Sequence, residues 1–357
     1  MAESRQSLTI GATTIQPGQR VTLELPVAQL TTHTPVTLPV HVVHGRREGP
    51  SLFVSAALHG DEINGVEIIR RVMSQPVLDR LAGTLIAVPL VNVFGFLQLS
   101  RYLPDRRDLN RSFPGSQGGS LAARLAALFM SEIASRCTHG LDLHTGAVYR
   151  ENLPHVRADL SDCELCRLTI AFGAPVILDS PYREGTLRKA CHDRQIPVIV
   201  YEAGEALRFG ERAIHTGVQG VLRLMNALGM IRMRSRPVNP ILTSASYWVR
   251  APMSGILRSL TSLGKLVSAD QVVGEIRDPL GNKVAEVRSR YGGVVIGLTH
   301  LPVINQGEAL FHVAMVDNVA EASELLEQFQ DEMERSPFYP LFKSCLHRSS
   351  IWKYSES

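Results

Sequence analysis

The sequence of 357 residues has few cysteines, few aromatic residues and no long apolar run. Its five cysteines are an odd number without regular spacing, which argues against a disulfide framework. No stretch of about 18 apolar residues occurs, so the sequence offers no candidate for a transmembrane helix. The N-terminal segment also lacks the apolar centre of a signal peptide. From these absences we expect a cytoplasmic protein.

An excess of charge of one sign is also absent. With 37 basic and 34 acidic residues the net charge is only +3, and no lysine-rich run occurs. This balance gives no reason to expect nucleic acid or a membrane surface as partner. A G-x-S-x-G segment is missing too, which argues against a serine hydrolase. The pair Cys163 and Cys166 has no second cysteine pair beside it, so we interpret both as small apolar residues of a helix.

Short apolar runs are present, and they alternate with amphipathic segments between residues 51 and 232. The runs at 51–58, 83–92, 138–145, 175–180 and 196–204 are typical of buried strands. The segments at 65–73, 121–136, 161–172, 186–194 and 211–228 are typical of helices. Continuously apolar strands joined by helices predict an α/β fold, with a mixed, mostly parallel sheet sandwiched by helices.

The length predicts more than one domain. Residues 1–50 alternate apolar and polar side chains and predict antiparallel strands that join the first domain, over 1–236. A Pro-Val-Asn-Pro segment at 237–240 opens a small all-β domain over 237–317. Residues 318–334 predict an acidic amphipathic helix, and 336–357 an aromatic, loop-like tail; together they make up a third part, 318–357.

The segment H-G-D-E at 59–62 follows the first apolar run. Because residues i and i+3 share a helical face, His59 and Glu62 are expected to point at one place. His144, in D-L-H-T-G at 142–146, also ends an apolar run. Active residues of such sheets gather beyond the carboxyl ends of the strands. Two histidines and a glutamate leave a fourth position open, as in catalytic zinc sites, so we expect one Zn²⁺ per subunit.

A hydrolase of this kind also needs a proton acceptor and a positive group. Glu202 ends a fully apolar strand and is the candidate base, with Glu205 as the second choice. The loop 101–115 concentrates four arginines, whose planar side chains suit carboxylates. The sequence therefore predicts metal-assisted hydrolysis of a substrate that carries negative charge.

The motifs H-G-D-E, R-Y followed by D-L-N-R-S-F, D-L-H-T-G and E-A-G resemble those of the succinylglutamate desuccinylase/aspartoacylase family, within the wider zinc carboxypeptidase-like fold group. The resemblance covers about residues 36–230, and the β segment at 241–316 is similar to the family's C-terminal domain. It implies that His59, Glu62 and His144 bind zinc and that Glu202 is the general base and acid.

The same resemblance implies that Arg101 polarises the scissile carbonyl, with Arg106 and Arg107 as alternatives because the spacing to Asn110 is wide. Asn110 and Arg111 are expected to hold the substrate carboxylate. Arg188 is our choice for a further substrate-binding arginine. Asp142 is expected either to accept a hydrogen bond from a ligand imidazole or to be a structural carboxylate.

The β segment also resembles the barrel-sandwich fold of biotinyl and lipoyl carrier domains. Lys283 is displaced from the hairpin tip where those carriers present a lysine. We therefore expect the domain to shield the active site or to form an oligomer interface, with a homodimer as the default.

The sequence thus predicts a zinc-dependent deacylase of a small N-acyl amino acid. Two alternatives stay open at this stage. One is a metallocarboxypeptidase that acts on peptides or a peptide-like polymer. The other is a non-catalytic binding protein that retains the fold.

Overall fold

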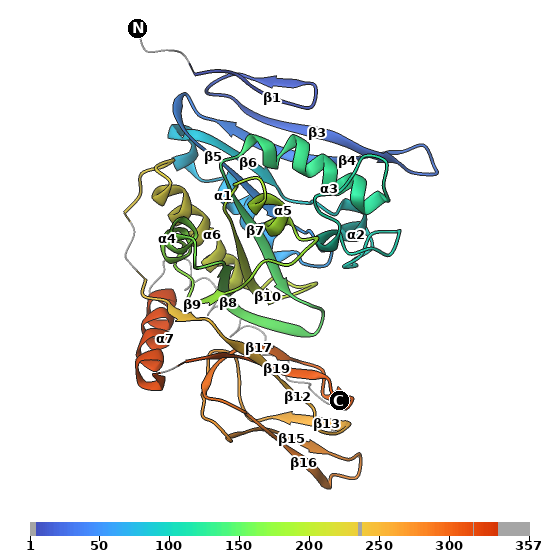
Figure 1. Ribbon diagram of the computed structural model, residues 1–357, viewed down its shortest axis with the longest axis vertical. Helices are drawn as coiled ribbons and strands as arrows, with labels where there is room; N and C mark the ends of the chain where they lie inside the picture. The colour runs from blue at the N-terminus through green and yellow to red at the C-terminus, as the bar shows by residue number, and fades with distance from the viewer. Residues whose placement is uncertain (1–4, 235–237, 317, 335–357) are drawn as a thin grey trace, which may run out of the picture.

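The computed structural model describes residues 5–234, 238–316 and 318–334 (Figure 1). A mixed sheet with helices on both faces forms the upper part of the molecule in this view. An antiparallel β region forms the lower part. The predicted fold class is confirmed. The tail predicted at 336–357 lies outside the described residues.

The centre of the main sheet consists of four parallel strands in the order β6-β5-β7-β10. Antiparallel strands flank them, β4 and β3 beside β6 and β8 beside β10. The strands of this half are β3 (Arg20–Gln29), β4 (Pro35–His44), β5 (Arg47–Ala56), β6 (Ala82–Val88), β7 (His139–Gly146), β8 (Arg150–Ala158), β9 (Val176–Asp179) and β10 (Val198–Glu205). A separate hairpin, β1 (Leu8–Ile10) and β2 (Thr13–Ile15), precedes them.

Both faces of the central strands are buried, which explains their continuous apolar runs. In β5, Leu52 and Val54 pack on one side with α1 (Asn64–Met73), α4 (Cys163–Phe172) and α6 (Glu211–Ala227). Phe53 packs on the other side, with α2 (Val93–Leu97), α3 (Leu121–Glu132) and α5 (Leu187–His192). Short 3-10 turns lie at Pro76–Arg80, Leu109–Arg111 and Ala134–Arg136. No helix in the described part of the chain is both long and apolar enough to span a bilayer.

The C-terminal β region has its own core, around Val273, Ile276 and Phe311. Its strands are β11 (Ile241–Thr243), β12 (Ser246–Arg250), β13 (Gly255–Ser259), β14 (Leu266–Val267), β15 (Val272–Arg277), β16 (Lys283–Arg288), β17 (Gly293–Thr299), β18 (Val303–Ile304) and β19 (Ala309–Met315). Helix α7 (Val319–Glu334) buries Ala322 and Leu326 against the region.

Two strand pairs join the β region to the α/β half. β17 pairs antiparallel with β8, and β11 pairs parallel with β9. The main sheet therefore continues without a break from β3 to β12. The predicted helices and strands agree with the observed ones to within a few residues, but β8 and α2 were not predicted. The domain limits at 236 and 317 stay a prediction.

Candidate metal centre and binding pocket

The H-G-D-E motif lies in the loop between β5 and α1. The backbone NH of Glu62 donates to the carbonyl of His59 at 3.1 Å, which closes a turn. Gly60 lies so close to Gly95 that a Cβ added to Gly60 would be 2.0 Å from the carbonyl carbon of Gly95. The motif therefore precedes the helix, and the helical-face argument for His59 and Glu62 was wrong. The turn brings the two side chains together instead.

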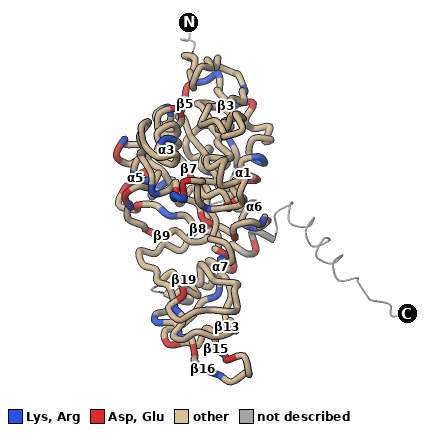
Figure 2. Tube along the Cα trace, turned by 90° about the vertical axis from the view of Figure 1, so that its right-hand side faces the viewer, with Lys and Arg blue, Asp and Glu red and all other residues tan. Residues whose placement is uncertain are grey.

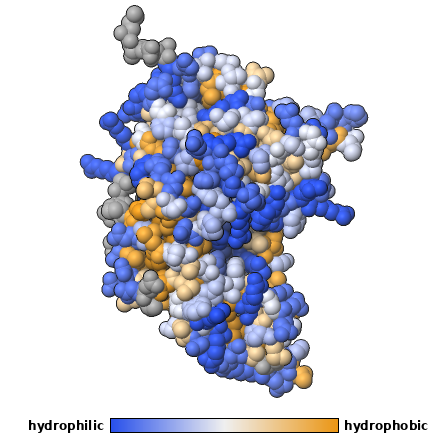
Figure 3. All heavy atoms as spheres, viewed as in Figure 1, coloured by the Kyte–Doolittle hydropathy of each residue, from blue (hydrophilic) through white to orange (hydrophobic). Residues whose placement is uncertain are grey.

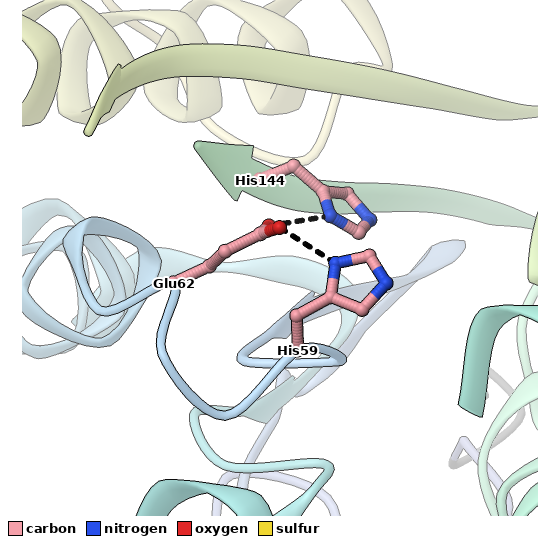
Figure 4. A group of neighbouring side chains, drawn as sticks. All are labelled: His59, Glu62 and His144. Carbon is pink, nitrogen blue, oxygen red and sulfur yellow. Dashed lines mark hydrogen bonds and ion pairs between the residues drawn. The ribbon is translucent and has the colours of Figure 1, made fainter. Parts of the chain in front are cut away.

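His59, Glu62 and His144 meet at one point (Figure 4). Their ligand atoms lie within 4.8 Å of one another. Glu62 Oε1 is 2.6 Å from His59 Nδ1, and Oε2 is 2.7 Å from His144 Nδ1. The three residues are 4%, 2% and 7% exposed. Two imidazole nitrogens and a carboxylate, all buried from solvent, match the donor set of a catalytic zinc site.

Carboxylates hold the outer nitrogens of both imidazoles. Asp142 Oδ2 lies 2.7 Å from His144 Nε2, and Asp108 Oδ1 lies 3.2 Å from His59 Nε2. When the outer nitrogen donates to a carboxylate, the inner one is left with its lone pair toward the shared point. Of the two roles expected for Asp142, this contact fits acceptance from a ligand imidazole. Asp108 was not predicted for this role, although it opens the D-L-N-R motif.

The charges of the cluster depend on one another. Burial opposes ionisation of Glu62, but the two imidazoles outweigh it and hold the pKa of the carboxyl far below its usual range. Burial likewise lowers the pKa of His144, but Asp142 and Glu62 overcome it and raise that pKa well above its usual value. Without metal the cluster therefore holds protons, and these must leave when a metal ion binds.

Glu202 lies on β10 directly opposite His144 on β7. Its Oε2 accepts a hydrogen bond from Asn152 Nδ2 at 3.1 Å, and its Oε1 is 3.9 Å from Arg157 Nε. Burial raises the pKa of Glu202, with Arg157 opposing the rise. A raised pKa suits a carboxylate that takes up a proton near neutral pH.

Glu205, the second choice for the base, is directed elsewhere. It accepts from the backbone NH of Tyr149 at 3.0 Å and pairs with Arg208 at 3.2 Å. It does not line the cavity that contains Glu202.

That cavity, of about 200 Å³, contains the three metal-ligand candidates and five arginines. Figure 3 shows hydrophilic side chains across the middle of one face, between the α/β half and the β region. In Figure 2 basic and acidic positions lie close together around β7 and β9. The basic lining residues are Arg101, Arg111, Arg157, Arg183 and Arg188, and the acidic ones are Glu62, Asp142 and Glu202.

Arg101 is the loop arginine that faces the metal-ligand candidates. Its Nη1 lies 3.2 Å from His59 Nδ1, and its Nη2 donates to Asp108 Oδ2 at 2.9 Å. Neither Arg106 nor Arg107 lines the cavity. Among the three arginines considered for the scissile carbonyl, the structure therefore brings Arg101 to the cluster.

Asn110, Arg111 and Arg188 also line the cavity. Asn110 Oδ1 accepts from the backbone NH of Leu187 at 3.0 Å, so the group it can offer a ligand is its amide nitrogen. Arg188 donates through Nη2 to the carbonyl of Pro181 at 2.7 Å and lies over the ring of Tyr182. Its Nη1 is buried without a hydrogen-bond partner. A buried guanidinium group with a nitrogen that lacks a hydrogen-bond partner is suited to bind an anionic ligand.

The sequence analysis missed Arg157 and Arg183. Arg157 lies on β8, which has too few apolar residues to stand out as a buried strand. Arg183 follows a proline and a tyrosine in the loop before α5. No motif of the sequence marked either position.

Fold and site together define a class of protein: an α/β chain with a His-Glu-His cluster at the carboxyl ends of its strands, beside an arginine-lined cavity. The chain belongs to the succinylglutamate desuccinylase/aspartoacylase family, because the family model of the catalytic domain matches residues 48–228, about half of the chain.

A curated relative is the N-alpha-acetyl-L-2,4-diaminobutyric acid deacetylase of Halomonas elongata. It is 29% identical over 304 residues, which cover 79% of this chain and 86% of the relative. The product-bound ectoine utilization protein EutE (DoeB) of Ruegeria pomeroyi superposes with a TM-score of 0.76 at 21% identity. A succinylglutamate desuccinylase/aspartoacylase of Rhodobacter sphaeroides does so with 0.75 at 23%. Both superpositions cover 84% of this chain and 95% of the other. They support the fold described above.

Proposed function

We propose that the protein is a zinc-dependent amidohydrolase that removes the acyl group from a small N-acyl amino acid. One observation carries the proposal: the His-Glu-His cluster, Glu202 and five arginines share one cavity. Family membership supports it, and so does the Halomonas elongata relative, which is named as a deacetylase of an acylated amino acid.

His59, Glu62 and His144 would hold the metal. The donor set fits zinc, because two neutral imidazoles and one carboxylate leave a tetrahedral position open. Their burial and the carboxylates on their outer nitrogens support the same assignment. Bound there, zinc supplies a water of pKa near 7 and a Lewis acid for the amide carbonyl.

The remaining steps fall to side chains of this chain. Glu202 accepts a proton from the attacking water and returns it to the departing amine. Arg101 donates to the carbonyl oxygen as negative charge develops on it. The amide nitrogen of Asn110 and the guanidinium groups of Arg111 and Arg188 hold the substrate carboxylate.

The charges of the cavity favour a substrate with more than one carboxylate. All three acidic lining residues have partners: Glu62 contacts both imidazoles, Asp142 contacts His144, and Glu202 accepts from Asn152. Five arginines face them. An ammonium group on the substrate would therefore be surrounded mainly by guanidinium groups, with Glu202 Oε1 as the carboxylate oxygen left without a hydrogen bond. N-acetylaspartate or N-succinylglutamate fits this balance better than acetyl-diaminobutyrate.

The size of the cavity favours a small amide over a peptide. Its volume of about 200 Å³ is below the roughly 300–1,000 Å³ of sites for drug-sized ligands. The metallocarboxypeptidase alternative would need a more extended groove.

A substrate panel tests the proposal. The zinc-loaded protein should hydrolyse N-acetylaspartate or N-succinylglutamate with a kcat/KM about 10–100-fold above that for acetyl-diaminobutyrate, as expected for one charge-assisted contact. A chelator should abolish the activity and zinc should restore it. Short peptides should be poor substrates. Preferred hydrolysis of peptides, or chelator-insensitive hydrolysis, would contradict the proposal.

Other parts of the proposal rest on the sequence. They are one zinc ion per subunit and a cytoplasmic location, while a homodimer is proposed only as the commonest default among oligomers.

A further inference from the structure

β8 brings three polar side chains to the base candidate. They are Asn152, His155 and Arg157, and His155 lies directly opposite Glu202 in the β8–β10 pairing. None of the three belongs to a motif singled out in the sequence. Each makes a contact that bears on the Glu202 carboxylate, directly or through a neighbour.

Asn152 makes the direct hydrogen bond. Its Nδ2 donates to Glu202 Oε2 at 3.1 Å, which occupies one oxygen and leaves Oε1 for a proton. An amide donor carries no charge, so it fixes the orientation of the carboxylate without forming an ion pair. A base acts only when its acceptor oxygen is directed at the proton.

Arg157 presents the competing interaction. Its Nε donates to His155 Nε2 at 3.2 Å and lies 3.9 Å from Glu202 Oε1. His155 is fully buried, and its Nδ1 faces the carbonyl of Leu153 at 2.8 Å. That contact requires a proton on Nδ1, so Nε2 is an acceptor for Arg157. His155 thereby holds the guanidinium group slightly too far from Glu202 for a close ion pair.

The C-terminal β region provides space for the Asn152 amide. Gly297 on β17 pairs with Asn152 across the β8–β17 ladder. A Cβ on Gly297 would lie 3.1 Å from Asn152 Oδ1 and 3.1 Å from His312 Cβ. These distances are tighter than most Cβ contacts, so the Asn152 amide or His312 would have to shift by a few tenths of an ångström to admit a side chain at position 297.

We propose that Asn152 is a positioning residue for Glu202, and that the glycine at position 297 of β17 leaves room for its amide. The inference rests on the proposed function. Without the amide donor, the carboxylate can rotate toward Arg157 and close the 3.9 Å gap, which removes Oε1 from the proton path. The β region then supports the position of the proposed base, although none of its described residues lines the cavity with Glu202.

The test is a double-mutant cycle. Asn152→Ala should lower kcat about 10–100-fold, as loss of a supporting contact does, with KM within about threefold. Combined with Glu202→Gln, the same change should have no further effect, because residues that act as one unit are not additive. Zinc content measured by elemental analysis should stay at that of the wild type.

A matched control is available in the C-terminal β region. Asn305 Nδ2 donates to Glu308 Oε1 at 3.0 Å, the same kind of bond at an exposed position. Asn305→Ala should leave kcat unchanged. Gly297→Ala, which requires only a small shift of the Asn152 amide, should lower kcat by less than Asn152→Ala does. Asn152→Asp, which keeps the volume but loses the donor, tests the inference if the alanine variant fails to fold.

Unchanged kcat in Asn152→Asp overturns the inference, and so does a full additive loss in the Glu202→Gln background. Inactivity of the wild type on the whole substrate panel instead rejects the proposed function. The two failures are thus distinct.

Discussion

At the scale of single residues, Asp108 connects two parts of the site. One carboxylate oxygen faces His59 Nε2 at 3.2 Å, and the other accepts from Arg101 Nη2 at 2.9 Å. These two cationic neighbours hold the pKa of Asp108 far below its usual range although burial acts in the opposite direction. The carboxylate therefore stays ionised and fixes the positions of a metal ligand and the arginine proposed for the carbonyl.

We predict that Asp108→Ala weakens zinc binding about 10–100-fold, because the imidazole of His59 loses its orienting partner. The measurement is a competition titration with a chromophoric chelator. Asp79→Ala is the control, since Asp79 pairs with Arg20 at 3.4 Å and lines a different cavity. An unchanged zinc affinity in Asp108→Ala would show that His59 needs no such partner.

Much of the site was predictable at this scale because its residues lie in motifs at strand ends. His59, Glu62, His144 and Glu202 follow apolar runs, and Asn110 and Arg111 lie in the D-L-N-R motif. Asn152 and Arg157 were not predictable, because their relation to Glu202 depends on which strand pairs with β10. The spacing of residues along the chain does not indicate which strands pair.

At the scale of elements, β8 is the strand that the sequence analysis missed. Its residues include Glu151, Asn152 and His155, so it lacks the continuous apolar run by which the other central strands were identified. The polar residues reflect its place between the parallel strands and the β region, where it pairs with both β10, which contains Glu202, and β17.

The strands at this junction contain two buried histidines, His155 on β8 and His312 on β19. Burial lowers the pKa of His155 well below its usual value and that of His312 to about 3, with Arg157 acting in the same direction. Both are therefore neutral in the folded protein at neutral pH. Unfolded, each takes up a proton near pH 6.5. The stability that the two neutral imidazoles contribute is completely present above that pH. It is lost as the pH falls toward the lower pKa that each histidine has in the folded protein.

We predict that His312→Gln, which does not titrate, reduces the loss of stability on acidification. Between pH 7 and pH 5 the wild type should lose about 2 kcal/mol more of its free energy of unfolding than the variant, from one proton taken up on unfolding. Urea unfolding at the two pH values measures the difference. The control is His33→Gln, which replaces an exposed histidine. Between pH 7 and pH 5 its loss of free energy of unfolding should be close to that of the wild type and larger than that of His312→Gln. Equal losses in wild type and His312→Gln would mean that His312 is not neutral in the fold.

At the scale of the whole molecule, the fold class and both halves were predictable from periodicity, but their connection was not. The pairs β8–β17 and β9–β11 join segments more than 60 residues apart, and no local pattern specifies such partners. The sequence predicts a domain limit at 236, whereas the main sheet contains strands from both sides of that limit.

We predict that zinc stabilises the whole fold. A ligand that binds only the native state adds RT ln(1 + [L]/Kd), or about 2.7 kcal/mol at a hundredfold excess over Kd. Thermal unfolding with and without zinc should show this as a higher Tm. The shift should vanish in His144→Ala and persist in His41→Ala, which replaces a histidine that contacts Thr22 far from the cluster. A shift that persists in His144→Ala would place the zinc elsewhere.

The late position of β17 in the chain has a consequence for biosynthesis. A ribosome has made the three metal-ligand candidates and Glu202 long before it reaches Gly293–Thr299, the strand that completes the outer edge of β8 at residues 150–152. Until then this part of the edge of β8 has unpaired backbone groups, and such an edge can pair with strands of other chains. That part of the edge stays open until most of the chain has been translated, and transiently unpaired strand edges favour aggregation.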